Sequence, residues 1–351
     1  MPDLLRDPGN GGVEGFVAGL PKAELHVHLQ GAASLGTVLA LARRHPEVGV
    51  PTDEAQLRAF YTFRDFAHFI DVYVAVNELV RTADDVRALV VGLGGDLSAV
   101  RVRYAEVTVT PDSHLMMGIP PDGLAEALDA GRAAVLDLYG VELAWVYDIP
   151  GELGLESGIR TIDWVERYRP PHSVGFGLGG PEQGVPRAQF ADVFRRATAL
   201  GLHSVPHAGE TTGPATIRDS LEWLGAVRIG HGISAVQDAG LMSELVDRGV
   251  VLEVCPWSNV RTRAVPSIEA HPFPQLVEAG VRVILNTDDP GMFDTNLNRE
   301  YLTAHHVFGL DRSALVGLAR ESVLASFAAE ETRRRLLAEI DTYAAQATGG
   351  G

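Results

Sequence analysis

The stretch Ala23-Glu24-Leu25-His26-Val27-His28-Leu29 decides how the rest of this chain is interpreted. It is a short, largely apolar run, which is typical of a buried β-strand. Side chains alternate between the two faces of a strand, so His26 and His28 are expected to point the same way. Two imidazoles on one face provide half of the ligands that a divalent metal needs.

Further residues able to bind a metal follow later apolar runs. They occur in three motifs, His207-Ala208-Gly209-Glu210, Gly230-His231-Gly232 and Asn286-Thr287-Asp288-Asp289-Pro290. Each motif comes at the end of a run that resembles a strand. We therefore expect these side chains to converge with the first pair of histidines.

Short apolar or β-branched runs alternate with longer helical patterns along the chain. They predict eight strands, at 23–29, 102–109, 142–148, 173–178, 202–207, 227–231, 250–255 and 281–287. Several are apolar almost throughout, as expected of strands buried on both faces of a parallel sheet. Helical spacing at 189–200, 239–248 and 271–279 ends each time before a glycine. This alternation of strands and helices predicts an α/β fold, a single (β/α)8 barrel of the TIM type.

One barrel domain is expected over residues 1–351, with two helical additions. An insertion at about 31–98 follows the first strand, which would place it over the mouth of the barrel as a lid. A helical tail is expected at about 311–345. The ends, 1–14 and 345–351, are Gly-rich or polar and are predicted to be flexible.

Composition narrows the possible partners. The 351 residues suit one large barrel, although two domains of ordinary size would also fit. A net charge of −17 disfavours nucleic-acid polymers and anionic membranes, but not a small nucleoside. The single cysteine, Cys255, excludes an internal disulfide. The N-terminus lacks a signal pattern and no apolar run reaches the ~20 residues of a membrane span, so we expect a cytoplasmic protein.

The candidate ligands all fall at the carboxyl ends of expected strands, where barrel enzymes carry their chemistry. Three imidazoles and a carboxylate favour zinc, although iron, cobalt or manganese could substitute. A second metal usually requires a bridging carboxylate on the fourth strand, which is often supplied by a modified Lys. Residues 173–180 contain no Lys, Asp or Glu. We therefore expect one metal ion per chain.

A lone histidine is more often a hydrogen-bonded core residue than a ligand. We accept that interpretation for His45, His68, His114, His172, His203, His271, His305 and His306. Glu210 follows His207 by three residues and could deliver a proton beside the metal. It could equally be an acidic residue at a helix N-terminus, and the two roles are compatible.

Five ordered motifs resemble those of the adenosine deaminase family. They are Pro21–Ala32, His207–Glu210, Ile229–Gly232, Cys255–Asn259 and Asn286–Pro290, and Arg103–Val107 resembles the family's second strand. The resemblance spans about residues 21–340. It implies a zinc ion held by His26, His28, His207 and Asp288. It also implies that Glu210 gives a proton to purine N1, while His231 and Asp289 orient the attacking hydroxide.

The resemblance also implies how a purine would be bound. The backbone N–H of Gly180 would meet purine N3, and the lid would supply apolar contacts from Phe66, Phe69, Ile70 and Tyr73. Gln30 stands where the family usually has an acid that contacts the ribose 5′-hydroxyl, so the amide would give up a charge-assisted bond. Pro181 is a second departure from the family pattern, beside Gly180.

The implied reaction is zinc-dependent hydrolytic deamination of an aminopurine nucleoside, foremost adenosine to inosine and ammonia, by metal-hydroxide attack at C6. Alternatives are adenine, an N6-substituted purine or a 5′-modified adenosine, then another amidohydrolase reaction, then a binding protein without activity. Family members that act on aminodeoxyfutalosine are expected to have an Arg just after the first strand. Residues 29–36 contain none, which disfavours that substrate.

Overall fold

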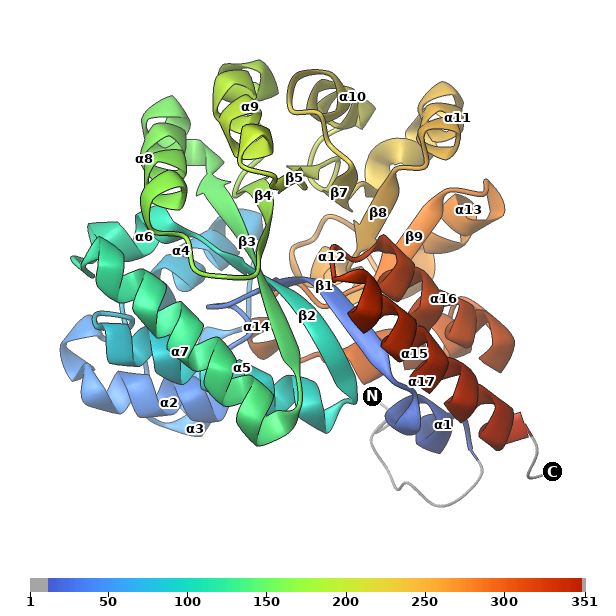
Figure 1. Ribbon diagram of the computed structural model, residues 1–351, viewed down its shortest axis with the longest axis horizontal. Coiled ribbons are helices and arrows are strands. Elements are labelled where there is room, and N and C mark those ends of the chain that lie inside the picture. Colours follow the sequence, from blue (N-terminus) through green and yellow to red (C-terminus); the bar gives the residue numbers. More distant parts are fainter. Residues whose placement is uncertain (1–11, 349–351) are drawn as a thin grey trace.

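Parallel strands form the centre of the computed structural model, which describes residues 12–348 (Figure 1). In chain order they are β1 (Lys22–His28), β2 (Val102–Val109), β3 (Glu142–Pro150), β4 (Ser173–Gly179), β5 (His203–Ser204), β6 (His207–Ala208), β7 (Arg228–His231), β8 (Val251–Val254) and β9 (Arg282–Leu285). Neighbours pair in the order β1-β2-β3-β4-β5 and β6-β7-β8-β9, and every pairing is parallel.

The two sheets are parts of one closed barrel. β5 and β6 belong to the same strand, which is interrupted at Val205-Pro206 because proline has no backbone N–H to donate. At the other seam, His28 N–H donates to Asp288 O at 2.9 Å and Asp288 N–H donates to His26 O at 3.0 Å. These bonds join β1 to the segment after β9. Eight strands therefore close into the predicted (β/α)8 barrel, and the expected strand positions are confirmed to within a few residues.

Helices surround the barrel (Figure 1). Those that alternate with the strands are α7 (Pro121–Tyr139), α8 (Gly154–Tyr168), α9 (Ala191–Ala199), α10 (Pro214–Trp223), α11 (Ala239–Arg248) and α13 (Phe273–Glu278). Local sequence sets their ends. In α11, the Asp238 side chain accepts a bond from the N–H of Leu241, and Gly249 ends the helix with φ 64°.

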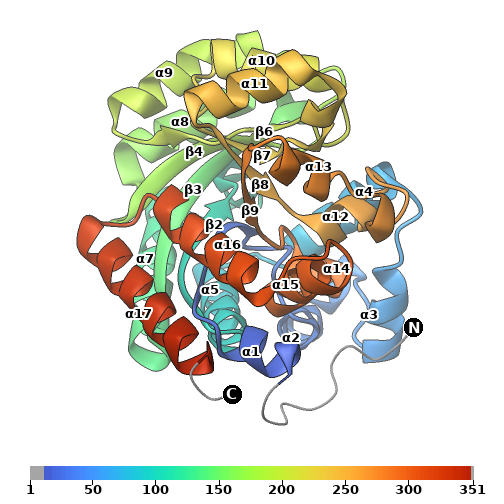
Figure 2. The same ribbon diagram turned by 90° about the vertical axis from the view of Figure 1, so that its right-hand side faces the viewer.

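The remaining helices belong to the insertion, to the tail and to the turns above the strands. The insertion contains α2 (Leu35–Arg44), α3 (Glu54–Phe60), α4 (Phe66–Asn77) and α5 (Ala83–Ala99). The tail contains α15 (Leu297–His306), α16 (Arg312–Ala325) and α17 (Glu330–Thr348), which lie together on one side of the barrel (Figure 2). Short helices α6 (Pro111–Met116), α12 (Pro256–Arg261) and α14 (Pro290–Phe293) follow β2, β8 and β9.

The expected flexible ends lie mostly outside the described residues. In the overlap, residues 13–14 begin α1 (Val13–Gly19) and residues 345–348 end α17, and the flexibility of the ends stays a prediction. Among the helices of residues 12–348, none combines the length and the apolar character that crossing a membrane requires.

The barrel interior carries a buried ionic network as well as apolar side chains. The Arg228 guanidinium donates to Glu106 and, at 2.6 Å, to Glu253. The side chains of Arg228 and Glu253 are only 2% and 3% exposed. A buried charge is tolerated only when it is paired in this way. Because Glu253 also contacts His26, the network connects the core of the barrel to the candidate ligands.

Candidate active site

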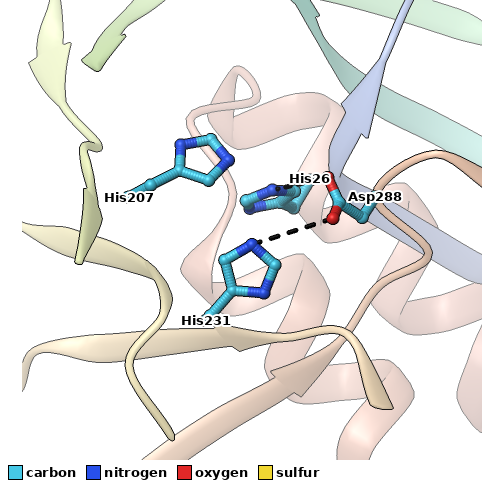
Figure 3. A group of neighbouring side chains, drawn as sticks. All are labelled: His26, His207, His231 and Asp288. Atoms are coloured by element: carbon cyan, nitrogen blue, oxygen red, sulfur yellow. Dashed lines mark ion pairs between the residues drawn. The ribbon is translucent and has the colours of Figure 1, made fainter. Parts of the chain in front are cut away.

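Five side chains able to bind a metal converge at the carboxyl ends of the strands. His26 and His28 come from β1, His207 from β6, His231 from β7, and Asp288 follows β9. One ligand atom from each of His26, His207, His231 and Asp288 lies within 4.8 Å of the others (Figure 3). His28 Nε2 lies 3.2 Å from His207 Nε2 and 3.2 Å from Asp288 Oδ1. The structure therefore brings together all four predicted ligands, with His231 beside them.

The free lone pairs in this cluster fit a cation. His26 Nδ1 donates to Glu253 Oε2 at 2.8 Å, so in the neutral ring that binds a metal the lone pair is on Nε2, an atom that is buried without a hydrogen-bond partner among the described residues. His207 Nδ1 donates to Leu178 O at 3.0 Å, which likewise leaves the lone pair on Nε2. Two such nitrogens beside the Asp288 carboxylate are the donor set that a divalent transition metal prefers.

Outer contacts fix the orientation of the candidate ligands. Glu253 holds His26, and the Ser258 hydroxyl donates to Asp288 Oδ2 at 2.6 Å. Metal-binding histidines and carboxylates are usually oriented by partners of this kind. Sequence reasoning did not identify either partner, although Glu253 could have been noticed as a lone acid in an apolar strand.

Two residues of the cluster have an unusual backbone conformation. His231 has φ 60° and Asp288 has φ 65°, both in the left-handed region. This conformation costs a non-glycine residue about 1–3 kcal/mol and is concentrated at functional sites. Two hydrogen bonds to β1, those to His26 and His28 described for the barrel seam, hold the Asp288 backbone in place.

The Glu182 carboxylate holds the loop that carries Glu210. It accepts bonds from the backbone N–H groups of Gly209 at 2.7 Å, Glu210 at 2.7 Å and Thr211 at 2.9 Å, and from the Thr212 hydroxyl at 2.6 Å. From the sequence, Pro181 stood out only as a departure from the family pattern, and the neighbouring Glu182 received no role. The structure shows that its acid determines where the Glu210 backbone lies.

The Glu210 side chain has one oxygen committed to hydrogen bonds and one near the cluster. Oε1 accepts from Asn259 Nδ2 at 3.2 Å and from the Thr262 hydroxyl at 3.1 Å. Oε2 lies 3.6 Å from His231 Nε2. Burial, followed by the nearby Asp288 and Glu182 carboxylates, raises the pKa of Glu210 to about 8. The group is therefore protonated at neutral pH, as a proton donor must be.

His231 is uncharged in this setting. It is 1% exposed, and burial lowers its pKa to about 4. Its Nδ1 lies 3.0 Å from Asn259 Nδ2, while its Nε2 faces Glu210 and lies 3.8 Å from Asp288 Oδ2. Asp289 is also buried, and burial together with Asp288 raises its pKa well above the ordinary range. Its Oδ1 has no hydrogen-bond partner among the described residues.

A cavity of about 280 Å³ opens above this cluster. Four of the predicted substrate-binding residues line it from α4, namely Phe66, Phe69, Ile70 and Tyr73. Phe69 packs on Phe293 with ring centres 5.0 Å apart, which fixes α4 against the turn after β9. The insertion thus forms part of the cavity wall, and its movement as a lid stays a prediction.

Gly180 also lines the cavity, whereas Gln30 does not. Gly180 has φ 78°, and a Cβ there would come within 2.2 Å of the Glu152 carboxylate. Gln30 is 1% exposed, and its Nε2 lies 2.8 Å from His114 Nε2. A direct contact between Gln30 and a sugar would require the side chain to turn.

The chain matches the adenosine deaminase family model over residues 21–343. Aminodeoxyfutalosine deaminase of Streptomyces avermitilis is 51% identical over 332 residues, covering 94% of this chain and 93% of that protein. Adenine deaminase of Rhizobium meliloti is 38% identical over 325 residues, covering 93% of this chain and 99% of that protein.

Solved structures show the same likeness. Adenine deaminase from Arthrobacter aurescens has a TM-score of 0.86 and 29% identity, covering 92% of this chain and 99% of that one. A zinc-bound amidohydrolase from Burkholderia ambifaria has a TM-score of 0.87 and 25% identity, covering 96% and 94%. From these matches and the cluster of histidines and aspartate, the chain belongs to the adenosine deaminase family of hydrolases.

Proposed function

We propose that this chain is a zinc-dependent deaminase of an aminopurine nucleoside, with aminodeoxyfutalosine as the favoured substrate. The observation that carries the reaction is the Glu210 carboxyl group. It is buried, its pKa is raised to about 8, and it borders both the cavity and the cluster of candidate ligands. A protonated acid beside a polarised water is what hydrolysis of a ring C–N bond requires.

Zinc is the favoured ion because three imidazoles and one carboxylate are its common ligands. His26, His28, His207 and Asp288 would hold it, and the Burkholderia ambifaria structure contains zinc in the same fold. When bound, a zinc ion lowers the pKa of a coordinated water and so supplies hydroxide near neutral pH. The unpartnered Nε2 of His26 supports this fit.

The remaining groups position the reactants. Glu210 donates a proton from Oε2 to the purine N1 while C6 is attacked. His231 Nε2 faces the attacking oxygen, and Asp289, at the same edge of the cavity, helps to orient it. Gly180 presents a backbone edge to the base, since no side chain fits there. Phe66, Phe69, Ile70 and Tyr73 exclude water from the other face.

Similarity favours aminodeoxyfutalosine as the substrate. Two Streptomyces proteins with that activity in their names are 51% and 50% identical to this chain, whereas the Rhizobium meliloti adenine deaminase is 38% identical. This order runs against the expectation from residues 29–36, which lack an Arg. The absence of one Arg from a loop is weaker evidence about the substrate than 51% sequence identity over 332 residues.

The cavity lining is consistent with a nucleoside that carries a further substituent. Its mouth is apolar, because Val74, Met116, Met117 and Leu153 line it while staying 48%, 54%, 39% and 43% exposed. The apolar part of such a substituent would cover these side chains, which is favourable by ~25 cal/mol per Å². Among the described lining residues there is no Lys or Arg, which disfavours a phosphate.

An ammonia-release assay tests this proposal. Purified, zinc-loaded protein is incubated separately with aminodeoxyfutalosine, adenosine, adenine and AMP. We expect the highest kcat/KM for aminodeoxyfutalosine and the lowest for AMP. A preference for adenine or adenosine would overturn the substrate, and no ammonia from any of the four would overturn the reaction.

A pair of variants tests the apolar mouth. Met117→Ser removes a contact at the cavity, and Leu155→Ser is a matched control, because Leu155 is equally exposed at 39% but does not line the cavity. We expect Met117→Ser to raise KM for aminodeoxyfutalosine about tenfold, a transfer loss typical of one large side chain, and to leave adenine unchanged. Equal effects of the two variants would show that the mouth does not contact the substrate.

A further inference from the structure

We infer that His271 is a positioning residue, which fixes the tautomer of His231 through the side chain of Asn259. This inference rests on the proposed deamination for its kinetic consequence, although the tautomer itself can be measured without turnover. From the sequence, His271 was expected to be a hydrogen-bonded core residue. The structure agrees that its ring is buried and hydrogen-bonded, and shows that these bonds belong to a continuous chain that ends at the candidate active site.

The chain begins at the backbone. The N–H of Phe273 donates to His271 Nδ1 at 3.1 Å. A nitrogen that accepts a bond from an N–H carries no proton, so a neutral His271 must carry its proton on Nε2. The ring is 3% exposed, and burial lowers its pKa to about 3, so it stays neutral.

That proton determines which way the Asn259 amide points. His271 Nε2 lies 3.2 Å from Asn259 Oδ1 and donates to it. The Asn259 amide nitrogen is therefore turned the other way, toward Glu210 Oε1 at 3.2 Å and His231 Nδ1 at 3.0 Å. If the amide were reversed, its N–H₂ would face the N–H of His271, and two donors cannot share a hydrogen bond.

The last bond in the chain fixes His231. Because Asn259 donates to His231 Nδ1, the single proton of the neutral ring is on Nε2. This nitrogen faces Glu210 Oε2 at 3.6 Å and Asp288 Oδ2 at 3.8 Å. An N–H cannot bind a metal, so His231 is a hydrogen-bond donor in the cavity. Of the two possible sets of ligands, the geometry therefore favours the one that contains His28.

The Asn259 amide also determines which oxygen of Glu210 carries the proton. Asn259 and Thr262 both donate to Oε1, which makes Oε1 the carbonyl oxygen of the protonated acid. The proton is then on Oε2, the oxygen nearer His231. One buried amide, oriented by His271, thus presents two protons on the same side of the cavity, although His271 itself does not line it.

Nitrogen-detected NMR of the histidine rings measures the tautomer directly. We expect His231 in the wild-type protein to carry its proton on Nε2, in the metal-free and the zinc-loaded states alike. His231→Gln identifies the signal by its disappearance. A proton on Nδ1 of His231 would overturn the inference, whatever the enzyme does in turnover assays.

Three variants connect the tautomer to rate. His271→Phe keeps the ring that packs near Phe308 but removes both hydrogen bonds, and His271→Gln restores a donor toward Asn259. Phe308→Leu is the control for packing alone. We expect His271→Phe to lower kcat roughly 10–100-fold, as for other buried orienting partners, with KM changed less than about threefold.

The comparison among variants separates this inference from the proposed function. His271→Gln should recover most of the kcat that His271→Phe loses. Phe308→Leu should have nearly the kcat of the wild-type protein. A His271→Phe enzyme that is folded, binds zinc and turns over like the wild type would overturn the positioning role while the deaminase proposal stands. If His271→Phe does not fold, the wild-type NMR spectrum and the kcat of His271→Gln still test the positioning role of His271.

Discussion

Replacing Glu210 with glutamine removes one proton and little else. Glutamine has the same shape, and its Oε1 can still accept from Asn259 Nδ2 and the Thr262 hydroxyl, at 3.2 and 3.1 Å in the wild type. The amide nitrogen then occupies the place of Oε2, 3.6 Å from His231 Nε2. It carries hydrogens but cannot release one to the purine at useful rates. The variant therefore isolates proton delivery from positioning.

The expected loss follows from the value of a general acid. Such a group typically contributes 10²–10⁴-fold, which corresponds to about 2.7–5.4 kcal/mol of transition-state stabilisation. We expect the loss in kcat, with zinc content unchanged, because Glu210 is not among the candidate ligands. Ammonia release under saturating substrate measures kcat, and metal analysis of the same sample supplies the control.

The pH profile gives a second test of the same residue. The pKa of Glu210 is raised to about 8, so its proton is present below that pH and lost above it. In the wild type, kcat should therefore fall as the pH rises through this region. In Glu210→Gln the low residual rate should show no such fall. A variant that keeps wild-type kcat, or the same alkaline fall, would refute the role assigned to Glu210.

Three other predictions concern the supports of the site. Glu253→Gln weakens the bond that orients His26 and should lower zinc affinity about 10–100-fold in a chelator competition, while Glu244→Gln on the surface should not. Glu182→Gln breaks a buried, charged hydrogen-bond network and should destabilise the fold by about 3–5 kcal/mol in urea unfolding; an unchanged midpoint would exclude Glu182 as the anchor of its loop. Removing the metal should abolish ammonia release reversibly and lower Tm, and added zinc at ~1,000 Kd should restore about 4 kcal/mol of stability; activity that survives exhaustive chelation would rule out metal dependence.

Strand positions could be predicted from sequence because parallel barrel strands are short apolar runs between helices that end in glycine. The expectation for residues 202–207 shows the limit of this approach. The run is one strand of the barrel, as expected, but the sequence pattern did not indicate that Pro206, which cannot donate a ladder bond, interrupts it between β5 and β6. A closed barrel could be expected from eight strands, but no pattern in the sequence indicates the backbone bonds around Asp288 that close it.

The candidate ligands could be predicted because each follows a strand and the carboxyl ends of the strands meet. Their supporting partners could not. Glu182 is 28 residues from Glu210, and Glu253 is 227 residues from His26, so only the folded chain shows these contacts. His271 illustrates the same point, since a buried histidine in a core and one in a hydrogen-bond chain have the same sequence signal.

At Gln30, the contact implied by the family resemblance differs from the orientation of the side chain in the structure. The family resemblance implies a sugar contact at this position, two residues after β1, but the Gln30 side chain faces His114 and is absent from the cavity lining. A residue two positions after a ligand can point away from the cavity, because the chain turns sharply between β1 and α2. The side-chain direction is then set by the turn and not by the strand.

A crystal structure of the zinc-loaded protein, with anomalous data at the zinc edge, tests the central claim most directly. The expected result is one ion, at ~2.0–2.2 Å from the Nε2 atoms of His26, His28 and His207 and from an Asp288 oxygen, with His231 outside the coordination sphere. Two ions, an ion bound elsewhere, or a bond from the zinc to His231 in place of His28 would contradict the account.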